Sequence, residues 1–145
     1  IVAQGDGAFA MLAQTQERNM TGELLIQANA LQIPFADRSV DGTVMFRFLH
    51  HLPPEAAKAA IREACRVSGR FVVFSFFHPC SLHHLQRRLR QLLGTPATRF
   101  AMTLKDVKKV AKQNGFQLHR ATAQLPFARD LWVVSFTRST SSDRQ

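Results

Sequence analysis

Asp6 is the first residue in this chain with the chemistry of a ligand-binding group. It is a carboxylate flanked by Gly5 and Gly7, at a point where a short apolar run gives way to a helical pattern. Folds that bind dinucleotides hold an acid at this kind of strand-to-helix junction, where the carboxylate accepts from the 2′ and 3′ hydroxyls of ribose. A plain turn aspartate between two glycines is the alternative interpretation.

Arg47, His50 and His51 form a second polar group, directly after the apolar stretch 42–46. Histidine titrates near neutral pH, so His51, or His50 beside it, could take a proton from a hydroxyl or amine. Helix capping or packing is the competing interpretation for both histidines. Arg47 could pair with the carboxylate of a cofactor or with an anionic substrate.

Four further potential metal ligands follow the strand predicted to end at Phe77: His78, Cys80, His83 and His84. Their spacing matches no standard structural zinc pattern, and a helix through them would spread the ligands apart. No metal site is therefore predicted, and these side chains are expected near the mouth of a substrate site.

The elements that must position these residues can be read from apolar periodicity. Short apolar runs predict strands, and repeats at helical spacing predict helices. Thr103, followed by Asp106, predicts a helix start, and Gly115 the end of that helix. The predicted strands are 1–3, 24–27, 42–46, 70–77, 117–122 and 131–137, and the predicted helices are 9–18, 54–66, 81–93 and 104–114.

This order predicts an α/β fold with a mostly parallel sheet, helices on both faces and an antiparallel hairpin at the C-terminal end. The 145 residues, 46% of them apolar, suit one domain over residues 1–138, with a polar, disordered tail at 139–145. No apolar run approaches the length of a membrane span. Cys65 is expected as a buried thiol, which favours a reducing, cytoplasmic setting.

The net charge of +9 is compatible with nucleic acid, an anionic membrane surface or an anionic substrate as partner. Much of the excess lies at 87–90 and 105–112, where basic and apolar residues alternate on predicted helices, so a solvated helix face is favoured. The chain has one tryptophan, no tyrosine and no RNA-binding motif, so nucleic acid is not the expected partner.

Several segments together resemble the class I S-adenosylmethionine-dependent methyltransferases. The similarity is greatest to the small-molecule branch that includes the ubiquinone and menaquinone methyltransferases, whose pattern D-A-x-x-L-P-F-x-D-x-S-F-D precedes L-H-H-L. It extends more weakly over most of the chain. The matching segments are Asn29-Ala30, Ile33-Pro34-Phe35-Ala36-Asp37, Ser39-Val40-Asp41 and Leu49-His50-His51-Leu52.

The resemblance implies a Rossmann-like fold and methyl transfer from S-adenosylmethionine to a small-molecule acceptor. It implies that Asp6 binds ribose and that Asn29, where the family has an aspartate, accepts from the adenine amino group. His51 and His50 are the implied catalytic residues. An inactive methyltransferase-like domain that docks RNA or protein is the alternative function. The implied cofactor contacts are Asp6, Gly7, Asn29, Ala30, Phe46 and Arg47.

Two alignments to the family compete at the start of the chain. Either Gly5-Asp6-Gly7 is the tail of the family's glycine-rich loop, or Asp6 ends the family's second strand. The 23 positions from Asp6 to Asn29 hold one helix and one strand, which favours the second alignment. The first strand and the glycine loop are then expected upstream of Ile1. In the family, that strand lies between those that here end at Asp6 and Phe46.

Overall fold

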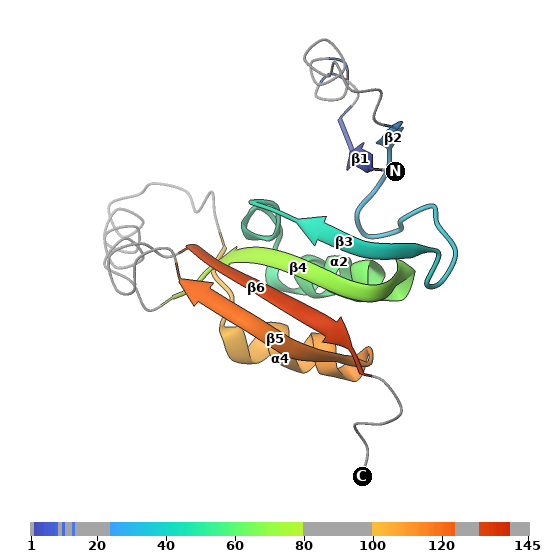
Figure 1. Ribbon diagram of the computed structural model, residues 1–145. Coiled ribbons are helices and arrows are strands. Elements are labelled where there is room, and N and C mark those ends of the chain that lie inside the picture. Colours follow the sequence, from blue (N-terminus) through green and yellow to red (C-terminus); the bar gives the residue numbers. More distant parts are fainter. Residues whose placement is uncertain are drawn as a thin grey trace, which may run out of the picture. The chain divides into compact units, whose positions relative to one another are not determined.

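The computed structural model describes residues 2–8, 10, 13, 24–79, 100–123 and 131–139. The chain divides into two compact units, Ile1–Pro34 and Phe35–Gln145, and each is described by itself (Figure 1). The predicted helix at 81–93 and the tail after 139 lie outside the described residues, as does nearly all of the predicted helix at 9–18.

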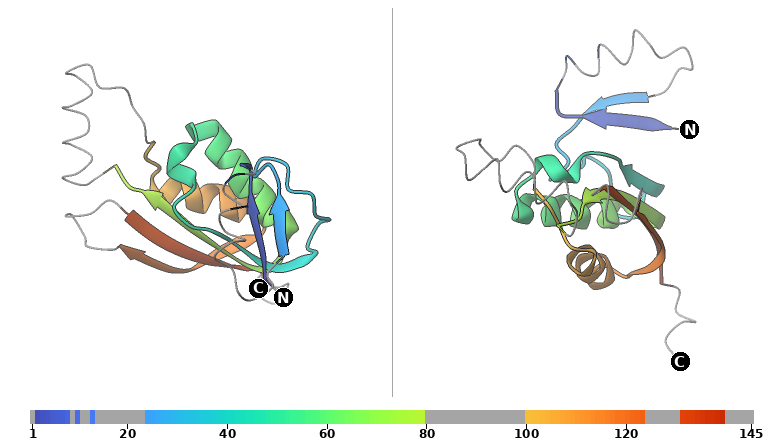
Figure 2. Two further views of the ribbon diagram at one scale, coloured as in Figure 1. Left: turned by 90° about the horizontal axis from the view of Figure 1, so that it is seen from above. Right: turned by 90° about the vertical axis from the view of Figure 1, so that its left-hand side faces the viewer.

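The first unit contains a parallel pair of strands, β1 (Ala3–Asp6) and β2 (Leu24–Gln27), drawn side by side in Figure 2. Their register runs from Ala3 opposite Leu24 to Asp6 opposite Gln27, so both carboxyl ends lie at the same edge. The predicted bounds of the first strand, 1–3, were wrong, because β1 extends to Asp6. Backbone pairing with β2 extends the strand through polar residues whose side chains stay exposed, and apolar periodicity cannot detect such pairing.

The second unit contains a four-stranded sheet in the order β3-β4-β6-β5. β3 and β4 are parallel, whereas β6 runs antiparallel to both β4 and β5. The predicted antiparallel C-terminal hairpin is therefore confirmed, within the α/β class expected. The bounds are β3 Val40–Met45, β4 Ser68–Phe77, β5 Phe116–Ala123 and β6 Leu131–Arg138.

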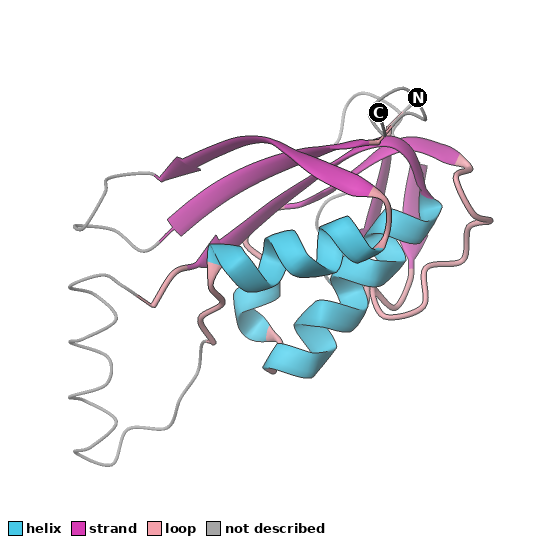
Figure 3. Cartoon of the chain, turned by 90° about the horizontal axis from the view of Figure 1, so that it is seen from below, coloured by secondary structure: helices cyan, strands magenta, loops and turns pink. Residues whose placement is uncertain are grey.

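Two helices, α2 (Pro54–Val67) and α4 (Leu104–Gln113), lie on one face of this sheet, as Figure 3 shows. Alternate residues of β4 point into the layer between sheet and helices, where burial of apolar surface stabilises the unit. A short 3₁₀ helix, η1 (Leu49–His51), connects β3 to α2. The fully buried core residues include Val72, Phe74, Phe76, Ile61, Val107, Val134 and Phe136.

Both ends of α4 follow the sequence prediction. The Thr103 hydroxyl oxygen accepts from the backbone N–H of Asp106 at 3.1 Å and its O–H donates to the Asp106 carboxylate at 2.6 Å. These bonds lower the pKa of Asp106. Gly115 follows the helix at φ +82°, a left-handed conformation that favours glycine.

At Val67, α2 ends without the glycine turn that commonly stops a helix. The helix ends at Val67 and β4 begins at once with Ser68, so Gly69 is a strand residue. The guanidinium of Arg138 takes over the role of a cap. It donates to the carbonyl oxygens of Cys65 at 2.9 Å, Gly69 at 3.1 Å and Ser68. A side chain distant in sequence thus satisfies one carbonyl of the last helical turn, that of Cys65, and the carbonyls of the first two residues of β4.

In the described part of the chain, no helix has both the length and the apolar character needed to cross a membrane.

Candidate functional site

The carboxyl ends of β1 and β2 present polar groups at one edge of the parallel pair. The backbone N–H of Ala28 donates to the carbonyl oxygen of Asp6 at 3.0 Å, which extends the ladder one step beyond the strands. The Asp6 carboxylate is exposed, and its Oδ1 accepts from the backbone N–H of Ala8 at 2.8 Å. Gln27 Nε2 donates to the Gly7 carbonyl oxygen at 3.3 Å, which holds the turn after β1 against β2.

Asn29 shapes the turn that follows β2. Its side-chain Oδ1 accepts from the backbone N–H of Leu31 at 2.9 Å, and its backbone carbonyl accepts from Gln32 at the same distance. Such Asx turns are a common use of asparagine in loops. Because the oxygen faces Leu31, the two N–H groups of the amide lie on the other side. Asn29 is exposed, and Ala30 beside it is half-buried.

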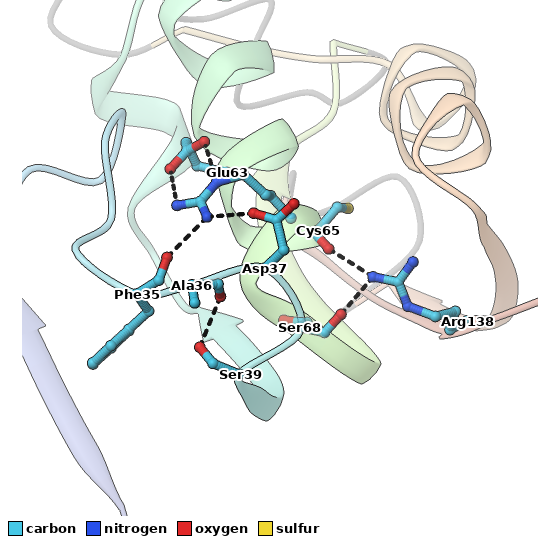
Figure 4. A network of polar contacts seen from close by, with 9 residues as sticks. Phe35, Ala36, Asp37, Ser39, Glu63, Cys65, Ser68 and Arg138 are labelled. Atoms are coloured by element: carbon cyan, nitrogen blue, oxygen red, sulfur yellow. Dashed lines mark hydrogen bonds and ion pairs between the residues drawn. The ribbon is translucent and has the colours of Figure 1, made fainter.

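The loop before β3 is held against α2 by Arg66, and Figure 4 shows its labelled partners Phe35, Asp37 and Glu63. The guanidinium donates through Nε and Nη2 to both oxygens of Glu63, each at 2.9 Å. Nη1 donates at 2.8 Å to the Phe35 carbonyl oxygen and to Asp37 Oδ1. The two carboxylates raise the pKa of Arg66. This fork fixes the segment 35–37, which lies between the Asn29 turn and β3.

The carboxyl end of β3 turns sharply at Arg47. Its φ of +54° lies in the left-handed region that non-glycine residues seldom adopt. The backbone N–H of Arg47 donates to the hydroxyl of Ser75, a fully buried residue of β4, and this bond holds the turn. Arg47 is exposed, and the side chain of Phe46 before it is 58% exposed.

The two histidines of η1 have different environments. His50 is only 2% exposed, and its ring stacks on Phe77 with centroids 4.1 Å apart. Its carbonyl oxygen accepts from the backbone N–H of Phe100 at 2.8 Å. The ring of His51 lies 4.1 Å from that of His50, and His51 is exposed. Of the two predicted catalytic residues, His51 is therefore the one that faces solvent.

The remaining histidine group is described only at its first member. His78 lies just after β4 with its ring centroid 5.3 Å from that of Trp132. Cys80, His83 and His84 lie outside the described residues. Within residues 2–79, 100–123 and 131–139, apart from the undescribed positions of the first segment, no three histidine, cysteine, aspartate or glutamate residues gather into a potential metal site.

The structure groups the predicted site residues in two sets. Asp6, Gly7, Asn29 and Ala30 come together at the β1–β2 edge of the first unit. The second unit carries the other four, Phe46, Arg47, His50 and His51, along the carboxyl ends of β3 and β4.

Sequence reasoning missed two residues that support these sets, Arg66 and Ser75. Arg66 follows Glu63 at helical spacing, a signal that predicts an ion pair but not its reach to Phe35. Ser75 is the one hydroxyl residue within the apolar run 71–77, which is the only indication in the sequence that it has a partner.

Comparisons with known proteins agree with this geometry. A family model described as a methyltransferase domain matches residues 2–76. No curated protein matches the chain. Among solved structures, magnesium protoporphyrin IX methyltransferase from Synechocystis PCC 6803 with bound SAH is similar, with a TM-score of 0.80 and 19% identity over 96% of this chain.

Two further structures have the same fold. The Synechocystis enzyme with bound SAM has a TM-score of 0.72 at 18% identity, over 96% of this chain. A SAM-dependent methyltransferase from Methanosarcina mazei also has a TM-score of 0.72, at 20% identity over 94% of this chain and 81% of its own. The chain spans 64% and 60% of the lengths of the two Synechocystis structures.

Proposed function

Because the chain belongs to the methyltransferase domain family, we propose that it takes part in methyl transfer from S-adenosylmethionine to a small-molecule acceptor. The observation that carries the proposal is the pairing of the β1 and β2 carboxyl ends, which sets Asp6 beside the Asn29 turn. In open α/β sheets, ligands bind outside the carboxyl ends of the strands. We also propose the ubiquinone and menaquinone methyltransferases as the nearest branch, on the motifs of residues 29–52.

The donors and acceptors at this edge fit the adenosine part of the cofactor. Asp6 uses one oxygen for the Ala8 N–H, and a carboxylate has lone pairs enough to accept from two ribose hydroxyls as well. Asn29 Oδ1 keeps a second lone pair beyond its bond to Leu31, which suits the adenine amino group. The backbone N–H of Ala30 is the kind of donor that an adenine ring nitrogen accepts from. Gly7 lets the chain after β1 approach the ribose.

The second unit would supply the acceptor side of the reaction. S-adenosylmethionine, when bound, provides a methyl group activated by its sulfonium. Phe46 is proposed at its methionine end, and Arg47 is proposed to pair with either the carboxylate of the cofactor or an anionic acceptor. His51, exposed at the end of β3, is the proposed group that takes the proton from the acceptor hydroxyl or amine. His50, with its ring buried against Phe77, is proposed to position η1 and thereby His51.

We further propose that a strand and a glycine-rich loop outside this sequence complete the sheet. In the described part of the chain, β1 pairs only with β2, and β3 has β4 as its only strand partner. Each strand therefore has one edge whose N–H and C=O groups lack a described partner, and proteins avoid leaving such edges open. Val44, 61% exposed on β3, supports this proposal.

The proposed setting is a single domain over residues 1–138 in the cytoplasm. The thiol of Cys65, free and buried, is compatible with a reducing compartment. Docking of RNA or protein by an inactive domain stays the alternative. On α4, the basic residues Lys105, Lys108, Lys109 and Lys112 are exposed opposite buried apolar ones, which is the solvated face expected from the sequence; residues 87–90 lie outside the described part.

Calorimetric titration of S-adenosylhomocysteine into the full-length gene product tests the proposal. We expect a dissociation constant on the order of micromolar, an affinity of about 8 kcal/mol. The matched control is Asp41→Ala, which removes a different exposed carboxylate, next to Arg70, and should bind as the wild type does. Absence of heat at millimolar ligand would overturn the enzyme proposal and favour the docking alternative.

A further inference from the structure

We propose that Arg47 makes the carboxyl end of β3 selective for an anionic acceptor, namely an apolar molecule that carries a carboxylate. The inference deepens the proposed methyl transfer and rests on it for the identity of the bound molecule as acceptor. Three observations carry it: the exposed guanidinium of Arg47, the absence of carboxylates bound to it in the described structure, and the apolar surface beside it.

The described carboxylates of the second unit all contact groups other than Arg47. Five acidic residues after position 35 are described, and none of them contacts Arg47. No ion pair to Arg47 occurs among the described residues, and Arg47 is exposed. The contacts are Asp37 and Glu63 with Arg66, Asp41 with Arg70, Glu55 with Lys58, and Asp106 with Thr103.

The polar residues that follow β3 run alongside the end of β4. The Arg47 backbone is bonded to Ser75, and two residues further along β4 the ring of His50 stacks on Phe77. Two residues along a strand span about 7 Å. His51 lies next to His50, so the Arg47 backbone and His51 both lie near the carboxyl end of β4. This spacing connects the anion site to the proposed base.

The side chain beside Arg47 is apolar. Phe46 is 58% exposed, an unusual degree for a phenylalanine, and it immediately precedes the cation. An exposed arginine that directly follows an exposed phenylalanine in the chain suits a molecule with one anionic and one apolar end, because the carboxylate would gain charge-assisted hydrogen bonds while the remainder would cover apolar surface.

Arg38 provides an internal control for this interpretation. It has nearly the same left-handed backbone, with φ +55° against +54° for Arg47, and it is also exposed. Arg38 lies at the amino end of β3, two residues before the strand begins at Val40. Its backbone N–H donates to the Arg66 carbonyl oxygen at 2.9 Å. Substitution of Arg38 therefore removes the same positive charge, from the same kind of left-handed turn, as substitution of Arg47. It leaves the carboxyl end of β3 unchanged.

The test is a titration of the ¹⁵N-labelled full-length gene product with phenylacetate and with its neutral isostere phenylacetamide, at constant ionic strength. Amide shifts of Arg47, His51 and Ser75 report binding. The wild type and Arg38→Met should bind phenylacetate roughly ten- to a hundredfold tighter than phenylacetamide, the scale of one charged hydrogen bond. Arg47→Met should abolish this preference, and Arg47→Lys should keep most of it.

Arg47→Gly separates charge from backbone geometry. Glycine adopts the left-handed turn without strain, so this variant should be at least as stable as the wild type and still lose the preference for phenylacetate. A preference retained in Arg47→Met, or lost equally in Arg38→Met, would overturn the inference.

The cofactor has a carboxylate of its own, and a second pair of ligands distinguishes it from the acceptor. We expect Arg47→Met to leave the affinities for S-adenosylhomocysteine and for 5′-methylthioadenosine, which lacks the amino-acid part, unchanged. Loss of affinity for S-adenosylhomocysteine alone would assign Arg47 to the cofactor and overturn the inference. If the wild type binds neither nucleoside but prefers phenylacetate, methyl transfer is wrong and the anion site stands.

Discussion

The backbone N–H of Ala28 donates a 3.0 Å hydrogen bond to the carbonyl oxygen of Asp6. This bond extends the parallel pairing by one residue beyond the end of β2. The chain therefore leaves both strands at the same end of the pair. The Asp6 carboxylate and the Asn29 turn consequently both lie at the carboxyl ends of β1 and β2. The proposed adenosine contacts depend on this relationship.

Asn29→Asp should strengthen cofactor binding. An aspartate keeps an oxygen for the Leu31 N–H, and replaces the N–H groups of the amide with a second acceptor. If the site binds adenine through its amino group, S-adenosylhomocysteine should bind roughly three- to tenfold tighter by calorimetry. The control is Gln32→Glu, which adds the same charge at a neighbouring exposed residue. Equal or weaker binding by Asn29→Asp would argue against the amino-group contact.

Arg138→Met should destabilise the second unit. The methionine removes the donors to the carbonyl oxygens of Cys65, Ser68 and Gly69, and the contact of the guanidinium with the Phe116 ring at 4.5 Å. We expect a loss of about 2 kcal/mol in the free energy of unfolding, measured by urea denaturation. Arg120→Met, an exposed β5 position, is the matched control. Similar values for the two variants would show that Arg138 is not a cap.

Cys65→Ala should reduce the fall in stability at alkaline pH. Burial raises the pKa of the Cys65 thiol from 9.0 to about 12. The folded state therefore retains a proton that the unfolded state loses, and this contribution to stability is present below pH 9 and declines between pH 9 and 12. The difference in unfolding free energy between wild type and variant, measured from pH 8 to 10.5, should follow this decline. A constant difference would contradict the assignment.

The isolated chain, residues 1–145, should not behave as a monomer that binds cofactor. The open edges of β1 and β3 would be filled by association with another chain or by rearrangement. Sedimentation and thermal unfolding should reveal oligomers or a broad transition, and calorimetry should detect no S-adenosylhomocysteine binding. A cooperatively folded monomer with micromolar affinity would show that the expected missing strand is wrong.

Local signals in the sequence were sufficient for much of the fold. The Thr103–Asp106 box, the apolar run of β4 and the helical repeat around Cys65 each depend on neighbours in the chain, and each was confirmed. The bounds of β1 and the cap by Arg138 depend on partners far along the chain. No local pattern records such partners.

The same limit applies to the candidate site. His50 and His51 are identical in type and adjacent, yet one is buried against Phe77 and the other is exposed, because η1 turns only one of them into the core. The Arg66 fork likewise joins α2 to a loop some thirty positions earlier. Residue type predicted which side chains could act, and tertiary packing decides which of them can reach a ligand.

The most direct test of the central claim is to locate the cofactor on the full-length gene product by NMR. Titration with S-adenosylhomocysteine should shift the amide resonances of residues 6–8 and 28–32, with much smaller changes along α4. Asp6→Ala should weaken binding by roughly 1.5–3 kcal/mol, the scale of a charged hydrogen bond, and leave thermal stability nearly unchanged because β1 is exposed. Unaltered affinity in Asp6→Ala, or shifts that bypass both segments, would contradict the account.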